Sequence, residues 1–418
     1  MEAINNVVLA VSNFLYQPFI LPVILLVGGL YFTIRTGGVQ IRMFKECLRV
    51  VTEKPKTENG ISSFGALMVS TASRVGTGNI IGVATAVICG GPGAIFWMWL
   101  SAFLGGASAF IESTLAQIYK KKNADGSSYG GPAFYMRDAL NARWLGVIFS
   151  VLIIFTYAIG YNMLAAFNLQ STFQVFSFYG DRTPAIIGVI LAALFGAVVI
   201  GGAHRLVKVT GVLVPVMGIV YVAISLIVLV LNIGNVPAMF AGIFKSAFDF
   251  QAIFGGFAGS CIMFGIKRGL YSNEAGMGSA PNAAATADVS HPVKQGLVQM
   301  LSVFIDTMLI CTATAFMCLS TNIIPQNYLG ADGSADAAGY VQAATASTLG
   351  KFGPIFIAFA MCLFAFTTLI GKYSYCEGCI RFIIQRDIKP GELLAFRLFA
   401  TALVFVGSIA SAGLVWNT

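Results

Sequence analysis

The chain has 418 residues, of which 57% are apolar and only 10% charged, whereas an ordinary soluble domain has roughly 45–50% apolar and about 25% charged residues. This balance excludes a soluble enzyme and a disordered chain, and it indicates one polytopic membrane domain over 1–418. The net charge of +8 would indicate nucleic-acid binding only if basic residues clustered with stacking aromatic residues on an exposed face.

Apolar runs of membrane-spanning length recur along the whole chain and predict an all-α membrane protein with ten transmembrane helices. They fall at 12–34, 61–89, 92–119, 144–173, 183–201, 207–232, 251–286, 293–320, 354–382 and 393–415. From Val39 to Val51, apolar and basic side chains alternate at helical spacing, which predicts an amphipathic helix on the membrane surface. Residues 12–60 therefore read as an extra N-terminal helix and a surface linker.

Basic residues predict the orientation of these spans. Twenty of the 25 Lys and Arg residues are counted with the loops after the first, third, fifth, seventh and ninth spans, six of them lying inside the adjoining spans, against three in the alternate loops. Lys and Arg in short loops accumulate on the cytoplasmic side. We therefore expect the N-terminus outside the cell, and we expect the basic charge to face anionic membrane lipid rather than nucleic acid.

The second and seventh spans are interrupted by glycines, between Arg74 and Gly82 and between Gly265 and Pro281. Such glycines either permit close helix packing or mark broken helices, whose freed backbone groups must line a cavity or be buried in protein. The N-terminal ends of half-helices suit an anionic substrate group, and unwound carbonyls suit a cation. The two interruptions are five spans apart, and this odd spacing favours broken helices in an inverted repeat.

The two repeats are expected at 61–232 and 251–418. The second is incomplete in this reading, because a fifth helix is missing where the chain stops at Thr418, just after the tenth span.

Six motifs in the same order resemble the alanine/glycine:cation symporter family. They are Val75 to Asn79, Gly91 to Trp99, Gly130 to Pro132, Ser272 to Pro281, His291 to Gly296, and Asp306 with Thr307. The resemblance implies the five-plus-five inverted-repeat fold of the bacterial leucine transporter, in a prokaryotic inner membrane. It also implies sodium-driven uptake of a small neutral amino acid such as alanine or glycine, with no cofactor. Proton coupling is the open alternative.

The resemblance also implies the site residues. Those expected to bind substrate, with the Thr77 and Gly78 amides holding the carboxylate, are Gly76, Thr77, Gly78, Asn79, Asn162, Gly265, Gly269, Ser272, Asn273 and Thr368. Those expected to bind sodium are Asn79 at one site and, at a second, the Ala72 and Val75 carbonyls with the Thr367 and Thr368 hydroxyls. The alternatives are a purely structural break, threonines that bond back to their own helix, and an Asn162 that joins helices.

Four ionisable residues within the spans are expected at similar depth: Arg74, Glu274, Asp306 and Lys372. Buried charges of this kind mark function or pair with one another, and we expect Arg74 to pair with Asp306. Lys372 stands where the resemblance leads us to expect Trp. It either changes side-chain selectivity or extends to the cytoplasmic interface.

Two other classes of membrane protein compete with a transporter. An intramembrane enzyme would need paired histidines, paired aspartates or a Ser–His dyad, yet the chain's two histidines, His204 and His291, fall in predicted loops. A channel needs a continuous filter, whereas two broken helices in inverted repeats form an alternating-access site. The sequence therefore predicts a symporter and no enzymatic activity.

Overall fold

The structure is a computed structural model that describes residues 20–55, 57, 60–123, 126–249, 261–331, 333–386 and 388–410. Its α-helices are α2 (Ile20–Arg35), α3 (Val39–Arg42), α4 (Phe44–Val51), α5 (Ser63–Arg74), α6 (Val83–Gly90), α7 (Ala94–Ile118), α8 (Pro132–Leu140), α9 (Arg143–Ile154), α10 (Tyr161–Thr172), α11 (Thr183–Ile200), α12 (Gly202–Leu231), α13 (Val236–Ala247), α15 (Cys261–Asn273), α16 (Ala280–Thr286), α17 (Pro292–Val303), α18 (Thr312–Leu319), α19 (Ala337–Leu349), α20 (Phe352–Ile384) and α21 (Pro390–Ile409).

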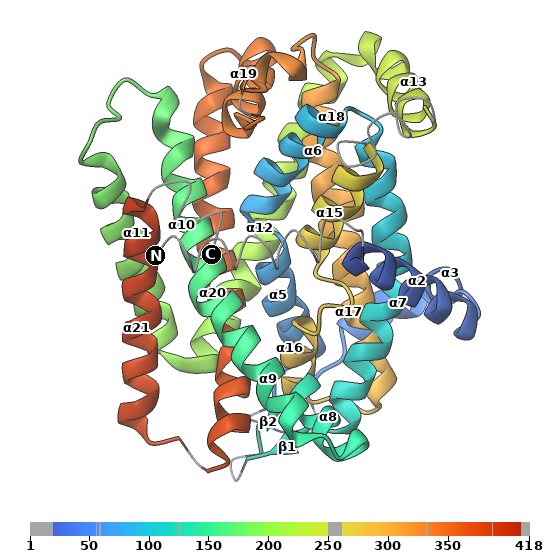
Figure 1. Cartoon of the computed structure of the whole chain (residues 1–418), viewed down its shortest axis with the longest axis vertical. Helices are drawn as coiled ribbons and strands as arrows, with labels where there is room; N and C mark the ends of the chain where they lie inside the picture. Colours follow the sequence, from blue (N-terminus) through green and yellow to red (C-terminus); the bar gives the residue numbers. More distant parts are fainter. Residues whose placement is uncertain are drawn as a thin grey trace.

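Shorter elements connect or interrupt these helices. The π-helical segments are η1 (Gly78–Gly82), η2 (Phe155–Gly160) and η6 (Phe304–Cys311), and the 3-10 segments are η3 (Phe173–Val175), η4 (Ile233–Asn235) and η7 (Pro325–Tyr328). Strands β1 (Lys121–Lys122) and β2 (Ser128–Tyr129) pair antiparallel, with Lys121 opposite Tyr129. The hairpin lies beside α8 at one end of the molecule, whereas α13 and α19 lie at the other end (Figure 1).

Within the described residues, seven helical stretches are long and apolar enough to cross a membrane, and α5 with η1–α6 forms an eighth, bent span. The predicted count of ten is therefore not confirmed. The predicted span 12–34 is described only from Ile20 and the span 251–286 only from Cys261, while 12–19, 251–260 and 411–415 lie outside the described residues. The remaining eight predicted spans each coincide with one observed span.

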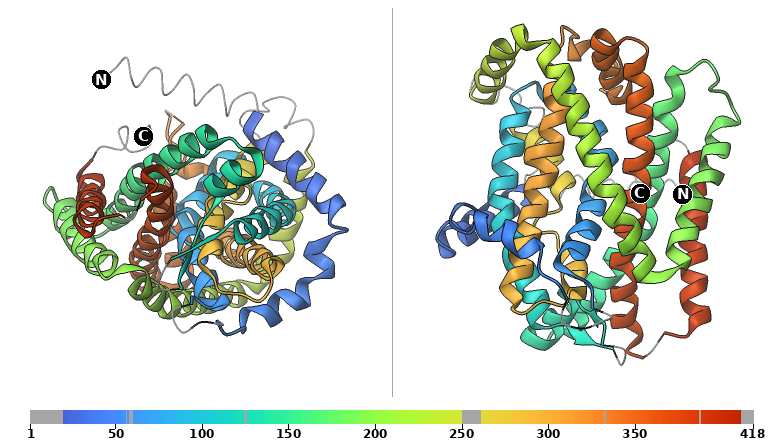
Figure 2. Two further views of the ribbon diagram at one scale, coloured as in Figure 1. Left: turned by 90° about the horizontal axis from the view of Figure 1, so that it is seen from below. Right: turned by 180° about the vertical axis from the view of Figure 1, so that it is seen from behind.

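The first predicted span does not lie parallel to the others. Helix α2 has 16 residues, and Figure 2 shows it crossing the side of the bundle against α7 rather than following the long axis. After it, the predicted surface helix forms as two pieces, α3 and α4, which meet at Met43. The Gln40 side chain in α3 donates to the Phe103 carbonyl of α7 at 3.0 Å, which fixes this corner to the bundle.

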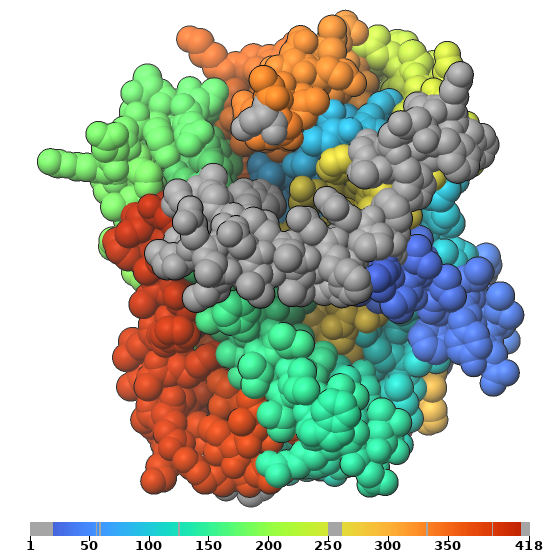
Figure 3. All heavy atoms as spheres, viewed as in Figure 1, coloured from blue at the N-terminus to red at the C-terminus, as the bar shows by residue number. Residues whose placement is uncertain are grey.

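The bundle has an inner and an outer group of helices. In α20, and in the span formed by α17, η6 and α18, 67% of the residues in the most apolar 18-residue stretch are buried, against 22% in α21. Helix α21 packs against α11 and α10, and the space-filling view shows it on the outer surface at the lower left (Figure 3). Its outward residues Leu398 and Phe399 are exposed, as expected for a side that faces lipid.

Among the described residues, three spans contain a π-helical segment: η1, η2 and η6. A π-helical turn inserts an extra residue and shifts the side chains that follow it, and such turns occur frequently at functional sites. Here they place Gly78, Tyr161 just after η2, and Asp306 toward the centre of the bundle. The apolar patterns of these spans did not predict the insertions.

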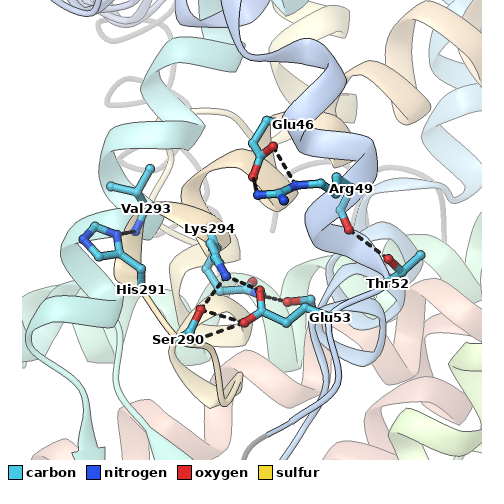
Figure 4. A network of polar contacts seen from close by, with 10 residues as sticks. Glu46, Arg49, Thr52, Glu53, Ser290, His291, Val293 and Lys294 are labelled. Carbon is cyan, nitrogen blue, oxygen red and sulfur yellow. Dashed lines mark hydrogen bonds and ion pairs between the residues drawn. The ribbon is translucent and has the colours of Figure 1, made fainter.

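A polar network joins the surface linker to the start of α17 (Figure 4). The Glu53 carboxylate lies 2.7 Å from Lys294 Nζ and accepts a hydrogen bond from Ser290 Oγ at 2.7 Å. Burial alone would raise the pKa of the Glu53 carboxyl, but the hydrogen bonds from Lys294 and Ser290 bring it below its ordinary value. The linker is thereby attached to the same segment that leads out of the second broken helix.

Candidate functional site

The first predicted break is present. Helix α5 ends at Arg74, Val75 is extended (φ −74°, ψ 96°), and the next helical segment starts at Gly78, bent by 53° from α5. The Gly76 amide donates to Asn79 Oδ1 at 2.7 Å, so the Asn79 side chain satisfies one backbone donor that the break leaves free. At a helix start the first N–H groups have no acceptor within the helix, and no described side chain accepts from the amides of Thr77 or Gly78.

The second predicted break is also present. Helix α15 ends at Asn273, and α16 begins at Ala280. Between them Glu274, Gly276 and Gly278 have positive φ angles of 52°, 78° and 77°, which only glycine adopts freely. The carboxylate of Glu112 on α7 is buried and accepts from the Gly276 and Gly278 amides at 3.2 and 3.0 Å.

A small cavity lies where the two broken helices meet α10 and α20. It is lined by Ser73, Arg74, Gly76, Thr77, Gly78, Tyr161, Ala165, Tyr271, Ser272, Thr368 and Lys372. The cavity has a volume of only about 10 Å³, which is room for roughly one water molecule. Backbone donors, hydroxyls and aromatic rings thus converge on one nearly closed space, into which five of the predicted substrate residues project.

Asn79 lies behind the cavity wall. Its Oδ1 atom accepts from Gly76, and its Nδ2 atom donates to Asp306 Oδ1 at 2.7 Å. Ser272 from the other broken helix donates to Asp306 Oδ2 at 2.9 Å. Asp306 therefore joins both breaks to η6, a role that the sequence did not indicate beyond its place in a motif.

Four predicted substrate residues lie elsewhere. Gly265 and Gly269 face α7, where an added Cβ would lie 2.4 Å from the Ala94 carbonyl oxygen and 2.3 Å from Ser101 Oγ, respectively. The Asn162 amide donates to Ala158 of its own helix at 3.1 Å, leaving Oδ1 without a partner. Asn273 donates to Thr307 and accepts from the Ala275 amide. These positions serve close packing and local hydrogen bonding in this conformation.

The two predicted sodium-binding threonines, Thr367 and Thr368, differ in the hydrogen bonding of their hydroxyls. Thr367 Oγ1 bonds back to the Leu363 carbonyl of its own helix at 2.9 Å. Thr368 Oγ1 is buried with no hydrogen-bond partner among the described residues and faces the first break, since a Cβ on Gly76 would lie 1.8 Å from it. An added Cβ on Gly371 would lie 2.5 Å from the Ser73 nitrogen and 2.9 Å from the Ala72 carbonyl carbon, so α20 and α5 are in backbone contact here.

The predicted ion pair of Arg74 with Asp306 is wrong. Arg74 Nη1 donates to the Gln299 carbonyl at 3.2 Å, and its Nε and Nη2 atoms have no hydrogen-bond partner in the part of the chain that the structure describes. No basic side chain among the described residues lies within ion-pairing distance of Asp306. The depth estimate assumed straight helices, whereas the break after Arg74 and the π-helical turn around Asp306 shift both side chains.

Lys372 pairs with Glu274 instead and does not extend to the interface. Its Nζ atom lies 3.7 Å from Glu274 Oε1 and 3.3 Å from the centroid of the Tyr161 ring, with the Tyr157 and Tyr271 rings each 5.8 Å away. The sequence analysis did not predict that three tyrosine rings would surround the Lys372 ammonium group. The spacing of Tyr157 and Tyr161, one helical turn apart, was the signal that was available.

A second cavity of about 260 Å³ opens toward the β1–β2 end of the molecule. It is lined from α5, α12, α16, α20 and α21, and it includes Val69, Tyr373, Ser374, Glu377 and Arg397. Its lining residue Tyr373 follows Lys372, which lines the central cavity, directly in α20. The loops at this end are those that the basic residues predict to be cytoplasmic.

Comparison with known proteins agrees with the predicted resemblance. A family model described as the sodium:alanine symporter family matches residues 1–418. The amino-acid carrier protein AlsT of Bacillus subtilis (strain 168) is 43% identical over 414 residues, which are 99% of this chain and 85% of the relative. A protein named "Probable sodium/glutamine symporter GlnT" from the same organism is 42% identical over 419 residues, covering 100% and 85% of the two chains.

One solved structure bears on the fold. A crystal structure of MhsT in complex with L-phenylalanine aligns with a TM-score of 0.59 and 16% identity, and the match covers 84% of this chain and 81% of that one. This likeness confirms the predicted fold of the leucine-transporter type.

Proposed function

The chain belongs to the sodium:alanine symporter family, and we propose that it imports a small neutral amino acid, such as alanine or glycine, together with sodium. The family and the relatives named above are transporters, which supports transport rather than catalysis as the activity of this chain. The observation that carries the proposal is the central cavity, where two broken helices expose backbone donors at the middle of an apolar bundle. Such a site is the common feature of secondary transporters with this plan.

The substrate's carboxylate binds at the helix start after the first break. The amides of Thr77 and Gly78 have no acceptor within the helix, and the positive end of the helix dipole favours an anion there. Gly76 and Gly78 carry no side chain that would keep the substrate from the backbone. Ser272 lines the opposite wall, but its hydroxyl donates to Asp306, so toward the substrate it can only accept a hydrogen bond.

Sodium binds between α5 and α20. The unpartnered Thr368 hydroxyl and the carbonyls of Ala72 and Val75 supply neutral oxygens, which suit a weakly held monovalent cation better than a divalent one. Thr367 contributes less, because its hydroxyl is already bonded to its own helix. Asn79 serves the other predicted sodium position, where its Oδ1 atom keeps one lone pair beyond the bond from Gly76.

The buried charges also support a cation. Among the described residues, the charged side chains that are buried are Arg74, Glu112, Glu274, Asp306 and Lys372. With all five ionised, the interior carries one net negative charge. An uncompensated charge inside a membrane protein is costly, and one sodium ion would neutralise it.

Transport then proceeds by alternating access in an inner membrane, with the N-terminus outside. Repeat one (61–232) and repeat two (251–418) form one inverted pair around the central cavity. The second cavity beside Tyr373 is the route to the cytoplasm, because it lies at the end of the molecule where the predicted cytoplasmic loops gather. In this conformation the substrate site itself is nearly closed.

The test is uptake of radiolabelled alanine by proteoliposomes. An inward sodium gradient should give saturable accumulation, and replacing external sodium with choline should abolish it. Uptake that persists in choline and follows an inward proton gradient would show a proton-coupled transporter and overturn the sodium assignment. Flux that does not saturate and never exceeds equilibrium would show a channel.

A further inference from the structure

Lys372 is a cation built into the wall of the substrate cavity. It is only 5% exposed, and it lines the cavity together with the first break and Ser272. It lies one helical turn beyond Thr368 on α20, about 6 Å along the axis. Because Thr368 faces Gly76 at the carboxylate end of the site, Lys372 marks the opposite end, where the substrate's side chain would lie.

The ammonium group of Lys372 is held without a close hydrogen bond. Cation–π contact with the Tyr161 ring, at 3.3 Å from its centroid, and the flanking Tyr157 and Tyr271 rings stabilise the charge. Its Glu274 partner is 3.7 Å away, longer than a hydrogen bond, and no closer acceptor lies among the described residues. An ammonium carries three N–H donors, so this buried group retains donors for a ligand.

Glu274 already balances the charge of Lys372 and is itself held in place. Ser279 Oγ donates to Glu274 Oε2 at 2.8 Å, and Ser73 Oγ donates to the same carboxylate at 3.3 Å. A second carboxylate beside Lys372 would therefore meet a like charge, which is unfavourable in a buried site. A neutral oxygen acceptor has no such cost.

From this geometry we infer that Lys372 makes the transporter select neutral amino acids whose side chain carries an oxygen acceptor, the hydroxyl and carboxamide class of serine, asparagine and glutamine, over alanine. This inference rests on the proposed function, because it assumes that the cavity binds an amino acid. The acceptor oxygen takes a hydrogen bond from Nζ that alanine leaves unmade. A site built to donate a hydrogen bond discriminates against ligands that lack the acceptor.

The experiment measures competition against labelled alanine uptake by unlabelled serine, asparagine, glutamine and glutamate in proteoliposomes. In the wild type, the best of the three neutral competitors should inhibit at a concentration about tenfold below unlabelled alanine, as expected for one hydrogen bond to a charged donor. Glutamate should compete less well than glutamine. In Lys372→Met, which keeps the side-chain length without donors, the advantage over alanine should disappear. Lys351→Met, at an exposed position, is the matched control and should keep the wild-type order.

Loss of folded protein is anticipated, because Lys372→Met leaves the Glu274 carboxylate buried without its cation. The double variant Lys372→Met with Glu274→Gln removes both charges and should transport alanine without the preference. If either variant keeps the wild-type order, or if all competitors weaken by the same factor, Lys372 does not contact the substrate's side chain. A wild type that transports none of these amino acids would instead overturn the proposed function.

Discussion

Gly76 and Thr368 face each other so closely that a methyl group on Gly76 would lie 1.8 Å from Thr368 Oγ1. The contact joins the break in the first broken helix to α20. The same two helices touch again at Gly371, opposite Ala72 and Ser73. The proposed sodium oxygens are therefore grouped by backbone contact between α5 and α20, and any change in the angle between these helices alters their spacing.

The first prediction concerns Gly76→Ala. The added methyl group should destabilise the folded protein by about 1–3 kcal/mol, because overpacking forces the backbone or the stiff Thr368 side chain to move. Melting temperature in detergent and sodium-dependent alanine uptake should both fall. Gly82→Ala is the matched control, since its nearest atom would be 3.9 Å away. Adding Thr368→Ala should restore part of the melting temperature but not the uptake. Equal stability of the two glycine variants would contradict the observed contact.

The second prediction separates the two neighbouring threonines. Thr368→Val removes a hydroxyl that has no hydrogen-bond partner within the described ranges, whereas Thr367→Val removes one that is bonded to Leu363. The sodium concentration for half-maximal uptake at saturating alanine should rise about tenfold in Thr368→Val, as expected when one favourable oxygen contact is lost. It should change little in Thr367→Val. Equal shifts in both variants would remove the reason for assigning sodium to Thr368 rather than to its neighbour.

Much of the fold could be predicted from the sequence. The glycines around Gly76 and Gly276 interrupt apolar runs, and lipid cannot satisfy the backbone groups that they free. This requirement, together with the odd spacing of five spans between the two interruptions, predicted two breaks, and the structure brings them to one cavity. Hydrophobic length likewise predicted eight of the observed spans, because the bilayer fixes how many apolar residues a span needs.

The details of the site were less predictable. Gly265 and Gly269 lie in the same run as the second break, but they pack on α7, and sequence does not show which face of a helix meets the cavity. The partner of Arg74 was mistaken because depth was counted along straight helices at about 1.5 Å per residue. A 53° bend and a π-helical turn invalidate that count.

The third prediction concerns pH and the network in Figure 4. The folded state keeps the pKa of Glu53 below its ordinary value of 4.5, so the carboxylate stabilises the fold above that pH. The contribution should fade as the pH falls below 4.5 through the lowered pKa. At pH 7 the wild type should be more stable than Glu53→Gln by up to about 1 kcal/mol and should melt at a higher temperature. The two melting temperatures should converge once the pH falls below the lowered pKa of Glu53. Asp181→Asn, at an exposed position, should show no such convergence.

The last prediction tests which buried charges are partners. Lys372 and Glu274 lie 3.7 Å apart, so Lys372→Met should leave a stranded carboxylate and cost roughly 3–5 kcal/mol. Adding Glu274→Gln should recover part of that loss, with a coupling energy of about 1–3 kcal/mol.

Arg74 instead bonds to Gln299, and Asp306 to neutral side chains. The losses in Arg74→Ala and Asp306→Ala should therefore add to within about 0.5 kcal/mol. Unfolding temperatures of the four single and two double variants in one detergent provide both cycles. A larger coupling for Arg74 with Asp306 than for Lys372 with Glu274 would contradict the pairing of Lys372 with Glu274 described above.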